Sequence, residues 1–158
     1  MRIELDSTLP YKIGDILEGL LLLRREQAEP RVQYVLRKFT TQHIVHELKY
    51  DTHILLIPFV GANIVMREDI VIDGNTMVIK TYGENYQTKK VPYMVTEARY
   101  ASDGDNTTRC SLLVEWAINK SGSLPKALES KLNDFGIKQH RSIQAREEQY
   151  IQKYLRSK

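Results

Sequence analysis

Basic side chains gather at two places in this sequence, and both places could bind a phosphate group. Arg24 and Arg25 close a helical pattern near the N-terminus, and Lys138, His140 and Arg141 lie in the middle of a longer one. Arginine forks and lysine ammonium groups are suited to phosphate oxygens. The alternative interpretation is that each cluster is a solvated helix face.

Two charged residues fall on strand faces that are otherwise apolar. Glu68 alternates with Met66 and Ile70, and Lys80 alternates with Val78 in the next strand pattern. A buried charge must be paired or reach water. We therefore expect both to border a solvated cavity, where they could meet a ligand headgroup. A register shifted by one residue would instead turn both outwards.

The sequence lacks the patterns of common catalytic and metal sites. His43 and His46 would face opposite sides of one strand, which disfavours a shared metal ion. The single cysteine, Cys110, falls on an apolar strand face, where a lone thiol is usually a small buried hydrophobe. There is no glycine-rich phosphate loop and no nucleophile with its base. We expect a binding protein without metal or cofactor rather than an enzyme, and the net charge of +3 is too small to indicate nucleic acid.

Hydrophobic periodicity predicts the elements that position these residues. Apolar residues at helical spacing predict a first helix over 13–23. Turn signals at 73–75 and 103–106 join neighbouring strand patterns, which favours an antiparallel meander. Alternation of apolar and polar residues predicts strands over 2–6, 32–36, 44–50, 64–72, 77–82, 90–101 and 110–118.

The last segment carries the strongest single signal. From Leu124 to Tyr154, apolar residues recur at helical spacing, which predicts a helix of about 30 residues, or roughly 45 Å. No other element is long enough to cover this stripe, so the sheet must. We predict one α+β domain, residues 1–158, in which a long C-terminal helix covers a curved antiparallel sheet. The residues expected to line the space between them are Met66, Glu68, Ile70, Leu112, Val114, Trp116, Leu128, Leu132 and Phe135.

One apolar stretch, residues 53–62, does not alternate. It is either a buried strand that ends at Pro58 or a hydrophobic loop beside a cavity mouth. Exposed apolar patches of the second kind mark contact with membranes or partners. The residues expected to make that contact are Leu55, Leu56, Ile57, Phe59 and Val60. The sequence shows no targeting segment, and the apolar run at 19–23 is far shorter than the roughly 20 residues of a membrane span.

Four stretches of the chain are similar to one family of lipid carriers. They are Leu9-Pro10 before the first helix, Ile57-Pro58-Phe59-Val60, the stretch from Glu68 to Asn85 with Thr76-Met77 and Thr81-Tyr82, and Ala127-Leu128-Glu129 before Phe135. With the order of elements, they resemble the START-like helix-grip folds and, within that group, the PRELI/slowmo family of phospholipid transfer proteins. The phosphatidylinositol transfer proteins are a second similar group, through Leu9-Pro10 and His140-Arg141.

The resemblance implies a carrier that moves one phospholipid between membranes, with phosphatidic acid or phosphatidylserine favoured. It places the headgroup beside Arg24 or Arg25 and Lys138, and Lys80, His140 and Arg141 complete the candidates. It makes loop 53–62 a lid that touches the membrane transiently. It also implies a small twin-Cys-x9-Cys helper protein and the mitochondrial intermembrane space, with the cytoplasm as the alternative location. Two other hypotheses stay open: a START-like module for another hydrophobic ligand, and a helix-grip enzyme that uses Glu68 or a histidine.

Overall fold

The computed structural model describes residues 2–30, 32–51, 63–91, 93–117 and 126–158. Every predicted element is present, and a four-residue helix, α2, is added. Helix α3 is confirmed as the longest element, at 32 residues. In chain order the elements are β1 (Arg2–Leu9), α1 (Ile13–Arg25), β2 (Val32–Phe39), β3 (His43–Asp51), β4 (Asn63–Asp73), β5 (Thr76–Gly83), α2 (Glu84–Gln87), β6 (Tyr93–Ser102), β7 (Thr108–Ala117) and α3 (Lys126–Ser157).

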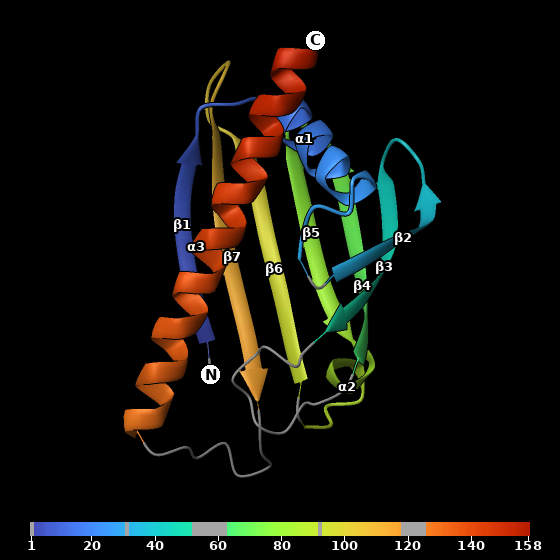
Figure 1. The fold of residues 1–158 in the computed structure, drawn as a ribbon. Helices are drawn as coiled ribbons and strands as arrows, with labels where there is room; N and C mark the ends of the chain where they lie inside the picture. The colour runs from blue at the N-terminus through green and yellow to red at the C-terminus, as the bar shows by residue number, and fades with distance from the viewer. Residues whose placement is uncertain (1, 31, 52–62, 92, 118–125) are drawn as a thin grey trace.

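The strands form one seven-stranded sheet in the order β1-β7-β6-β5-β4-β3-β2, and every pair is antiparallel. The predicted meander is confirmed from β2 to β7, and β1 joins it at the far edge beside β7. Figure 1 shows the sheet curving around α1 and α3, with α3 crossing its concave side obliquely and α1 lying near one end of the strands. The fold is therefore a helix-grip architecture.

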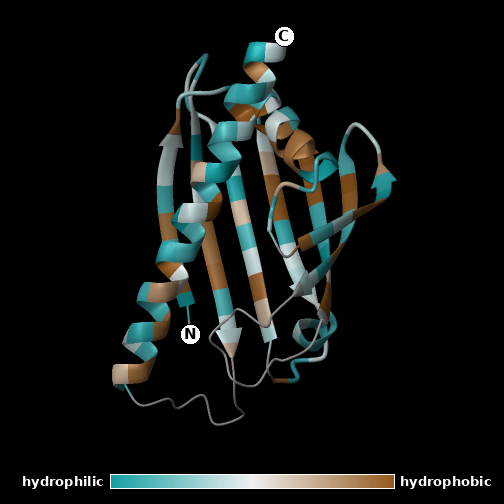
Figure 2. Cartoon of the chain, in the orientation of Figure 1, coloured by the Kyte–Doolittle hydropathy of each residue, from teal (hydrophilic) through white to brown (hydrophobic). Residues whose placement is uncertain are grey.

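The tightest packing lies where α1 covers the sheet. Ile16 and Leu20 of α1 are each 1% exposed, and Ile70 and Met77 beneath them are 0% exposed. Figure 2 shows α1 as largely apolar, whereas the visible side of α3 is largely hydrophilic. Cys110 is buried on the same concave face, as its strand pattern predicted. The core is thus concentrated at the α1 end of the sheet.

Helix α3 comes close to the rest of the fold at two glycines. A Cβ added at Gly19 of α1 would lie 2.5 Å from the Ile151 Cα of α3. A Cβ added at Gly136 of α3 would lie 2.9 Å from the Ile3 Cδ1 of β1. The contact at Gly19 is with backbone, so a side chain there would push the two helices apart, whereas the contact at Gly136 is with the end of a flexible side chain that can turn aside. Gly19 therefore sets how closely α3 approaches α1.

The first turns of α3 cover less of the sheet than the sequence predicted. Leu128 was expected to line the space under the helix, but its side chain is 44% exposed. Figure 1 shows the first turns of α3 extending past the edge strand β1, so a residue there has little described surface to cover. Leu132 and Phe135 are half-buried, and the fully buried residue of α3 is Ile151, near the other end. No helix among the described residues is long and apolar enough to cross a membrane.

Candidate ligand site between the sheet and the last helix

A buried ion pair joins the end of α1 to the concave face of the sheet. Arg24 Nε and Nη2 donate to the two carboxylate oxygens of Glu68 at 2.7 and 2.6 Å. Arg24 Nη1 also donates to the Leu20 carbonyl at 3.1 Å. Arg24 is 5% exposed and Glu68 is 2% exposed. Burial would raise the pKa of Glu68, but the Arg24 charge and the contacts with His46 outweigh it and lower the pKa to about 2.

His46 and Tyr34 complete this cluster. The register of β3 and β4 places His46 opposite Glu68, and His46 Nδ1 lies 3.1 Å from Glu68 Oε1. The Arg24 guanidinium lies 5.1 Å from the centre of the Tyr34 ring, within the range of a cation–π contact. Burial raises the pKa of Tyr34. The sequence analysis considered His46 as a metal ligand, and the histidines in general as catalytic groups of a helix-grip enzyme. The pairing of His46 with Glu68 follows from the strand register.

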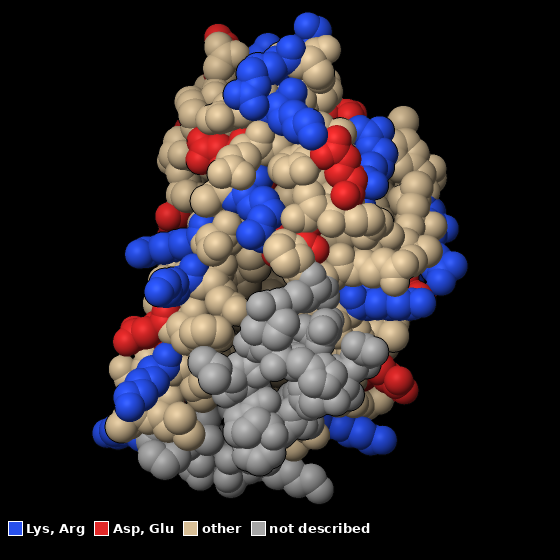
Figure 3. Space-filling view, viewed as in Figure 1, with Lys and Arg blue, Asp and Glu red and all other residues tan. Residues whose placement is uncertain are grey.

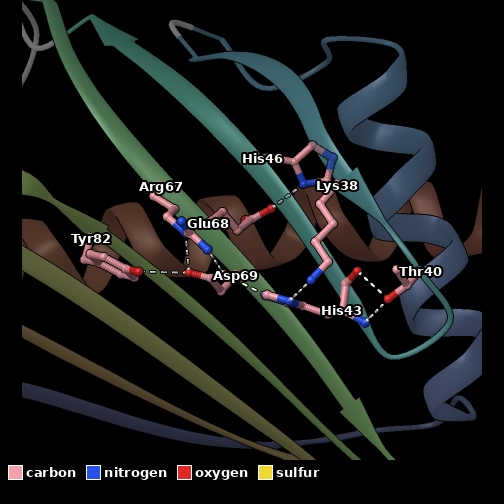
Figure 4. Close-up of polar contacts among 8 residues, drawn as sticks. All are labelled: Lys38, Thr40, His43, His46, Arg67, Glu68, Asp69 and Tyr82. Carbon is pink, nitrogen blue, oxygen red and sulfur yellow. Dashed lines mark hydrogen bonds and ion pairs between the residues drawn. The ribbon is translucent and has the colours of Figure 1, made fainter.

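The other side of β4 carries a separate polar network. Asp69 accepts hydrogen bonds from Arg67 at 2.9 and 3.0 Å and from Tyr82 at 3.0 Å, and His43 Nε2 lies 2.8 Å from it. Figure 4 shows His46 meeting Glu68, while His43, Arg67 and Tyr82 converge on Asp69. The predicted opposite orientation of the two histidines is thus confirmed. Among the described residues, no group of three or more His, Cys, Asp or Glu side chains could hold a metal ion.

A third carboxyl group faces the concave side from α3. Glu147 is half-buried, and burial raises its pKa from 4.5 to about 7. The Arg24 charge opposes this rise, and the charges of Glu68 and Glu29 add to it. Burial, and next the charge of Glu147, raise the pKa of Tyr100, which lies near the end of β6. No described residue donates a hydrogen bond to it.

Two further polar side chains share this inner face of α3. Asn133, His140 and Glu147 are spaced seven residues apart, and such residues lie along one side of a helix. Asn133 Oδ1 is buried and has no hydrogen-bond partner among the described residues. Burial lowers the pKa of His140. In the sequence, these three residues form a polar repeat of seven residues inside an otherwise apolar helical stripe, and the sequence analysis did not predict their shared position.

The sheet opposite this polar line is apolar but incompletely packed. We call it the far half of the concave face: Met94, Thr96, Leu112 and Trp116, on the strands β6 and β7. All are half-buried, although they point to the covered side of the sheet. At the α1 end, by contrast, Ile70 and Met77 are 0% exposed. The described elements therefore leave apolar surface between the sheet and α3.

The other residues predicted to line the space under α3 differ in burial and in their contacts. Met66, Ile70 and Val114 are buried, as expected. Glu68 is on the concave face as predicted, but it is paired with Arg24 rather than facing solvent. The proposed lid residues Leu55, Leu56, Ile57, Phe59 and Val60 lie outside the described residues.

The basic residues predicted to bind a headgroup are mostly on the outside. Arg24 is buried and paired, whereas its neighbour Arg25 is exposed. Lys138 and Arg141 are exposed and line, with other residues of α3, an open surface pocket of about 280 Å³. Figure 3 shows several basic side chains along this outer side of the molecule. His140 alone of the α3 cluster is partly buried against the protein.

Lys80 corrects the predicted orientation of β5. Met77 and Ile79 face the core, so Lys80 points to the convex side. Its ammonium group lies 5.7 Å from the centre of the Tyr82 ring and 5.4 Å from that of Tyr86. Both faces of β5 carry apolar residues, so its alternation alone could not show which face is buried. Lys80 is therefore not a headgroup ligand within the fold.

The curved antiparallel sheet and the long helix that covers it define a START-like helix-grip fold. The sequence matches no known family model and no curated protein. Human STARD10 matches in structure with a TM-score of 0.63 and 15% identity, covering 98% of this chain and 64% of that one. The Zhui aromatase/cyclase from Streptomyces sp. R1128 matches with a TM-score of 0.58 and 12% identity, and the match covers 99% of this chain and 94% of that one. A START superfamily protein from Mycobacterium smegmatis matches with a TM-score of 0.53 and 9% identity, and the match covers 94% of this chain and 97% of that one.

These likenesses confirm the predicted fold. They extend to the START-like group as a whole, and the narrower resemblance to the PRELI/slowmo family stays a prediction. Because one of the similar structures is an aromatase/cyclase, the fold by itself does not separate an enzyme from a binding protein. Function must be argued from the site.

The raised pKa of Glu147 predicts a stability that falls as pH rises from about 5 to 8. In this window the folded state keeps a proton that the unfolded state has released, so the free energy of unfolding decreases with pH. The shift from 4.5 to about 7 corresponds to about 3 kcal/mol at most. Glu147→Gln should abolish this loss, as measured by urea unfolding at several pH values. His140 opposes the trend but is present in both proteins, so their difference isolates Glu147.

Asp134→Asn is the matched control for this experiment, because Asp134 is exposed on the outer side of the same helix. It should keep the wild-type pH dependence. A difference between wild type and Glu147→Gln that does not change with pH would show that the Glu147 carboxyl is not desolvated.

Proposed function

We propose that this protein carries one amphipathic lipid, a phospholipid, in the space between α3 and the concave face, and moves it between membranes. The observation that supports this most is the mismatch between the two walls of that space. The far half of the concave face is largely apolar and half-buried, and α3 carries Asn133, whose Oδ1 is buried without a hydrogen-bond partner among the described residues. An amphipathic ligand satisfies both walls at once.

The two ends of the space suit the two ends of such a ligand. Arg24, Glu68, Tyr34 and Glu147 gather polar groups near the end of α1. Leu112 and Trp116 offer apolar surface farther along the sheet. Acyl chains along the far half would be removed from water, with a stabilisation of about 0.8 kcal/mol per buried methylene. In this proposal the headgroup lies at the α1 end.

Filling the space should abolish lipid carriage. Thr96 is half-buried on the concave side of β6, so Thr96→Trp would occupy the volume that acyl chains need. Native mass spectrometry of the wild type should show one co-purified phospholipid per chain, and vesicles should exchange lipid. Thr96→Trp should reduce both at least about tenfold, since displacing several methylenes costs more than the 1.4 kcal/mol of a factor of ten.

Arg99→Trp is the control, because Arg99 is exposed on the convex side of the same strand. It should retain lipid and transfer. Wild-type protein that carries no lipid and transfers none, with or without a helper protein, would contradict the proposal.

The resemblance to the PRELI/slowmo family supports a more specific version. In it, the lipid is phosphatidic acid or phosphatidylserine, the site of action is the mitochondrial intermembrane space, and a small twin-Cys-x9-Cys protein is a partner. Cell fractionation with a tagged chain and mass spectrometry of its bound proteins would test location and partner together. A cytoplasmic protein with no such partner would leave lipid carriage intact and remove this version.

A helix-grip enzyme is the second candidate, and Glu147 is the observation that favours it. A carboxyl group with a pKa of about 7 suits general acid–base catalysis. Recovery of the bound ligand unchanged after long incubation supports a carrier. Its conversion by the wild type, but not by Glu147→Gln, would support an enzyme.

A further inference from the structure

We infer that the end of the β2–β3 hairpin docks the protein on the surface of an anionic bilayer. The inference rests on the proposed function, because a carrier that moves lipid between membranes must meet them. The residues concerned, which we call the hairpin surface, are Leu36, Arg37, Lys38 and Phe39 at the end of β2. This surface is separate from the lid predicted at residues 53–62, which lies outside the described residues.

Two large apolar side chains of the hairpin surface are exposed. Leu36 is 54% exposed, and Phe39, at 62%, is the most exposed large apolar residue that the structure describes. The register places Leu36 opposite His46 and Phe39 opposite Ile44, so both side chains project on the concave side. His46 and Ile44 are buried there. The cover that α1 gives to β3 therefore does not reach the edge strand.

The hairpin end lies apart from both long helices. Figure 1 shows it on the opposite side of α1 from α3. Residues 36–42, which form the end of β2 and the turn, are all exposed. A projecting turn with apolar side chains can enter a flat partner surface without any other part of the fold standing in the way.

The outer edge of β2 is protected against pairing with another strand. Gln27 donates from Nε2 to the Tyr34 carbonyl at 2.9 Å and accepts from the Tyr34 N–H at 2.8 Å. These are the two backbone groups that an added strand would use. A register shift between Leu36 and Lys38 then bends the strand, and bulges and edge lysines are devices that prevent edge pairing. The hairpin surface therefore suits a partner that needs no backbone pairing, rather than an extended peptide or the β2 edge of a second copy.

The charge of the hairpin surface selects an anionic partner. Strand β2 carries two cations, Arg37 and Lys38, and no acidic residue. Arg37 pairs with Glu47 at 3.1 Å, but both side chains are largely solvated, so the pair is weak.

The contact made by Lys38 leaves its charge uncompensated. Lys38 Nζ lies 3.2 Å from His43 Nδ1, and Figure 4 shows the lysine reaching this ring. A ring nitrogen that accepts from an ammonium group belongs to a neutral imidazole. Figure 3 shows further basic side chains at this edge of the molecule. Cations beside exposed apolar side chains match the anionic headgroups and the acyl region of a membrane surface.

Vesicle flotation tests the inference. Wild-type protein should bind phosphatidylcholine vesicles that contain about one third phosphatidylserine at least about tenfold more strongly than vesicles of phosphatidylcholine alone. Leu36→Ser with Phe39→Ser should lower binding to the anionic vesicles at least about tenfold, since two apolar side chains no longer leave water. Arg37→Gln with Lys38→Gln should lower it to a similar extent and leave binding to phosphatidylcholine unchanged.

Two matched controls separate the hairpin surface from general charge and hydrophobicity. Arg99→Gln with Arg109→Gln removes the same two charges from exposed, paired side chains on the convex side of β6 and β7. Leu128→Ser removes an exposed apolar side chain of α3, near the opposite edge of the sheet. Both controls should bind the anionic vesicles as the wild type does. All variants should keep co-purified phospholipid, because none alters the far half of the concave face.

The outcomes separate this inference from the proposed function. Hairpin variants that bind vesicles as tightly as the wild type, or controls that lose as much binding, would overturn the docking surface and leave lipid carriage standing. Self-association of the wild type in analytical ultracentrifugation that Leu36→Ser with Phe39→Ser abolishes would assign the surface to a second copy and also overturn the inference. Wild-type protein that docks through the hairpin but carries no lipid would overturn the proposed function alone.

Discussion

Replacing Arg24 by methionine should lower the free energy of unfolding by about 3–5 kcal/mol, the largest effect of any single substitution proposed for this site. The change leaves the Glu68 carboxylate buried at 2% exposure, with His46 Nδ1 at 3.1 Å as its remaining close polar neighbour. Removing one partner of a buried ion pair costs more than the pair contributes, because the remaining charge has lost its solvent and its counter-ion. Urea unfolding at pH 7 measures the loss.

Two comparison proteins make this result specific. The double variant Arg24→Met with Glu68→Leu should recover at least half of the loss, since it leaves no buried carboxylate behind. Arg25→Met alters the exposed neighbour and should cost less than about 0.5 kcal/mol. If the single Arg24 variant costs less than about 1 kcal/mol, or the double is no more stable than the single, the ion pair does not anchor α1 to the sheet.

The Arg24–Glu68 ion pair should also make the free energy of unfolding fall at low pH. Because the pKa of Glu68 is lowered to about 2, its contribution is complete above pH 4.5 and is lost as the pH falls towards 2. Arg24→Met should remove this acid-dependent loss. Glu147 acts in a separate window, between about pH 5 and 8, so the two carboxyl groups can be told apart by pH alone.

The second large effect is expected at Gly19. In Gly19→Ala the new Cβ would lie 2.5 Å from the Ile151 Cα and 2.8 Å from the Ile151 nitrogen, so α3 itself must move. Overpacking of this kind costs about 1–3 kcal/mol, and it exceeds the roughly 1 kcal/mol that alanine contributes to a helix over glycine. Because Ile151 holds α3 over the sheet, retention of co-purified lipid should fall as well. Thermal unfolding and native mass spectrometry measure the two effects.

Gly14→Ala is the matched control in the same helix. A Cβ at Gly14 meets nothing within 4 Å, so this variant should be more stable than the wild type by up to about 1 kcal/mol. Equal stabilities of the Gly14 and Gly19 variants would mean that the α1–α3 contact is not close-packed.

The sequence predicted the elements well because their signals are local. The alternation of Cys110, Leu112, Val114 and Trp116 defined β7, and the apolar repeat defined α3. The failures came from elements whose two sides look alike or whose surroundings are not local. Lys80 was assigned to the covered face because β5 is apolar on both sides, and Leu128 was expected to line the space under α3, but its side chain is 44% exposed.

The site depended on contacts that no spacing could show. Arg24 and Glu68 are 44 residues apart, and their pairing requires the end of α1 to meet the middle of β4. Glu147 was passed over because a glutamate on a long helix is ordinarily solvated. Its importance came from how closely α3 passes the rest of the fold, and the backbone contact between Gly19 and Ile151 limits that approach. Polar residues that interrupt an apolar helical stripe at seven-residue spacing were the available signal.

The most direct test of a lipid between α3 and the sheet uses Trp116, the single tryptophan of the chain. Its side chain belongs to the far half of the concave face, where acyl chains are expected. Titration with a phospholipid brominated along its acyl chain should quench Trp116 fluorescence and saturate at one lipid per chain, whereas in Thr96→Trp the quenching of Trp116 and of the added tryptophan should not saturate in this way. Fluorescence that is unchanged by the brominated lipid, while the lipid binds, would place the ligand elsewhere and contradict the account.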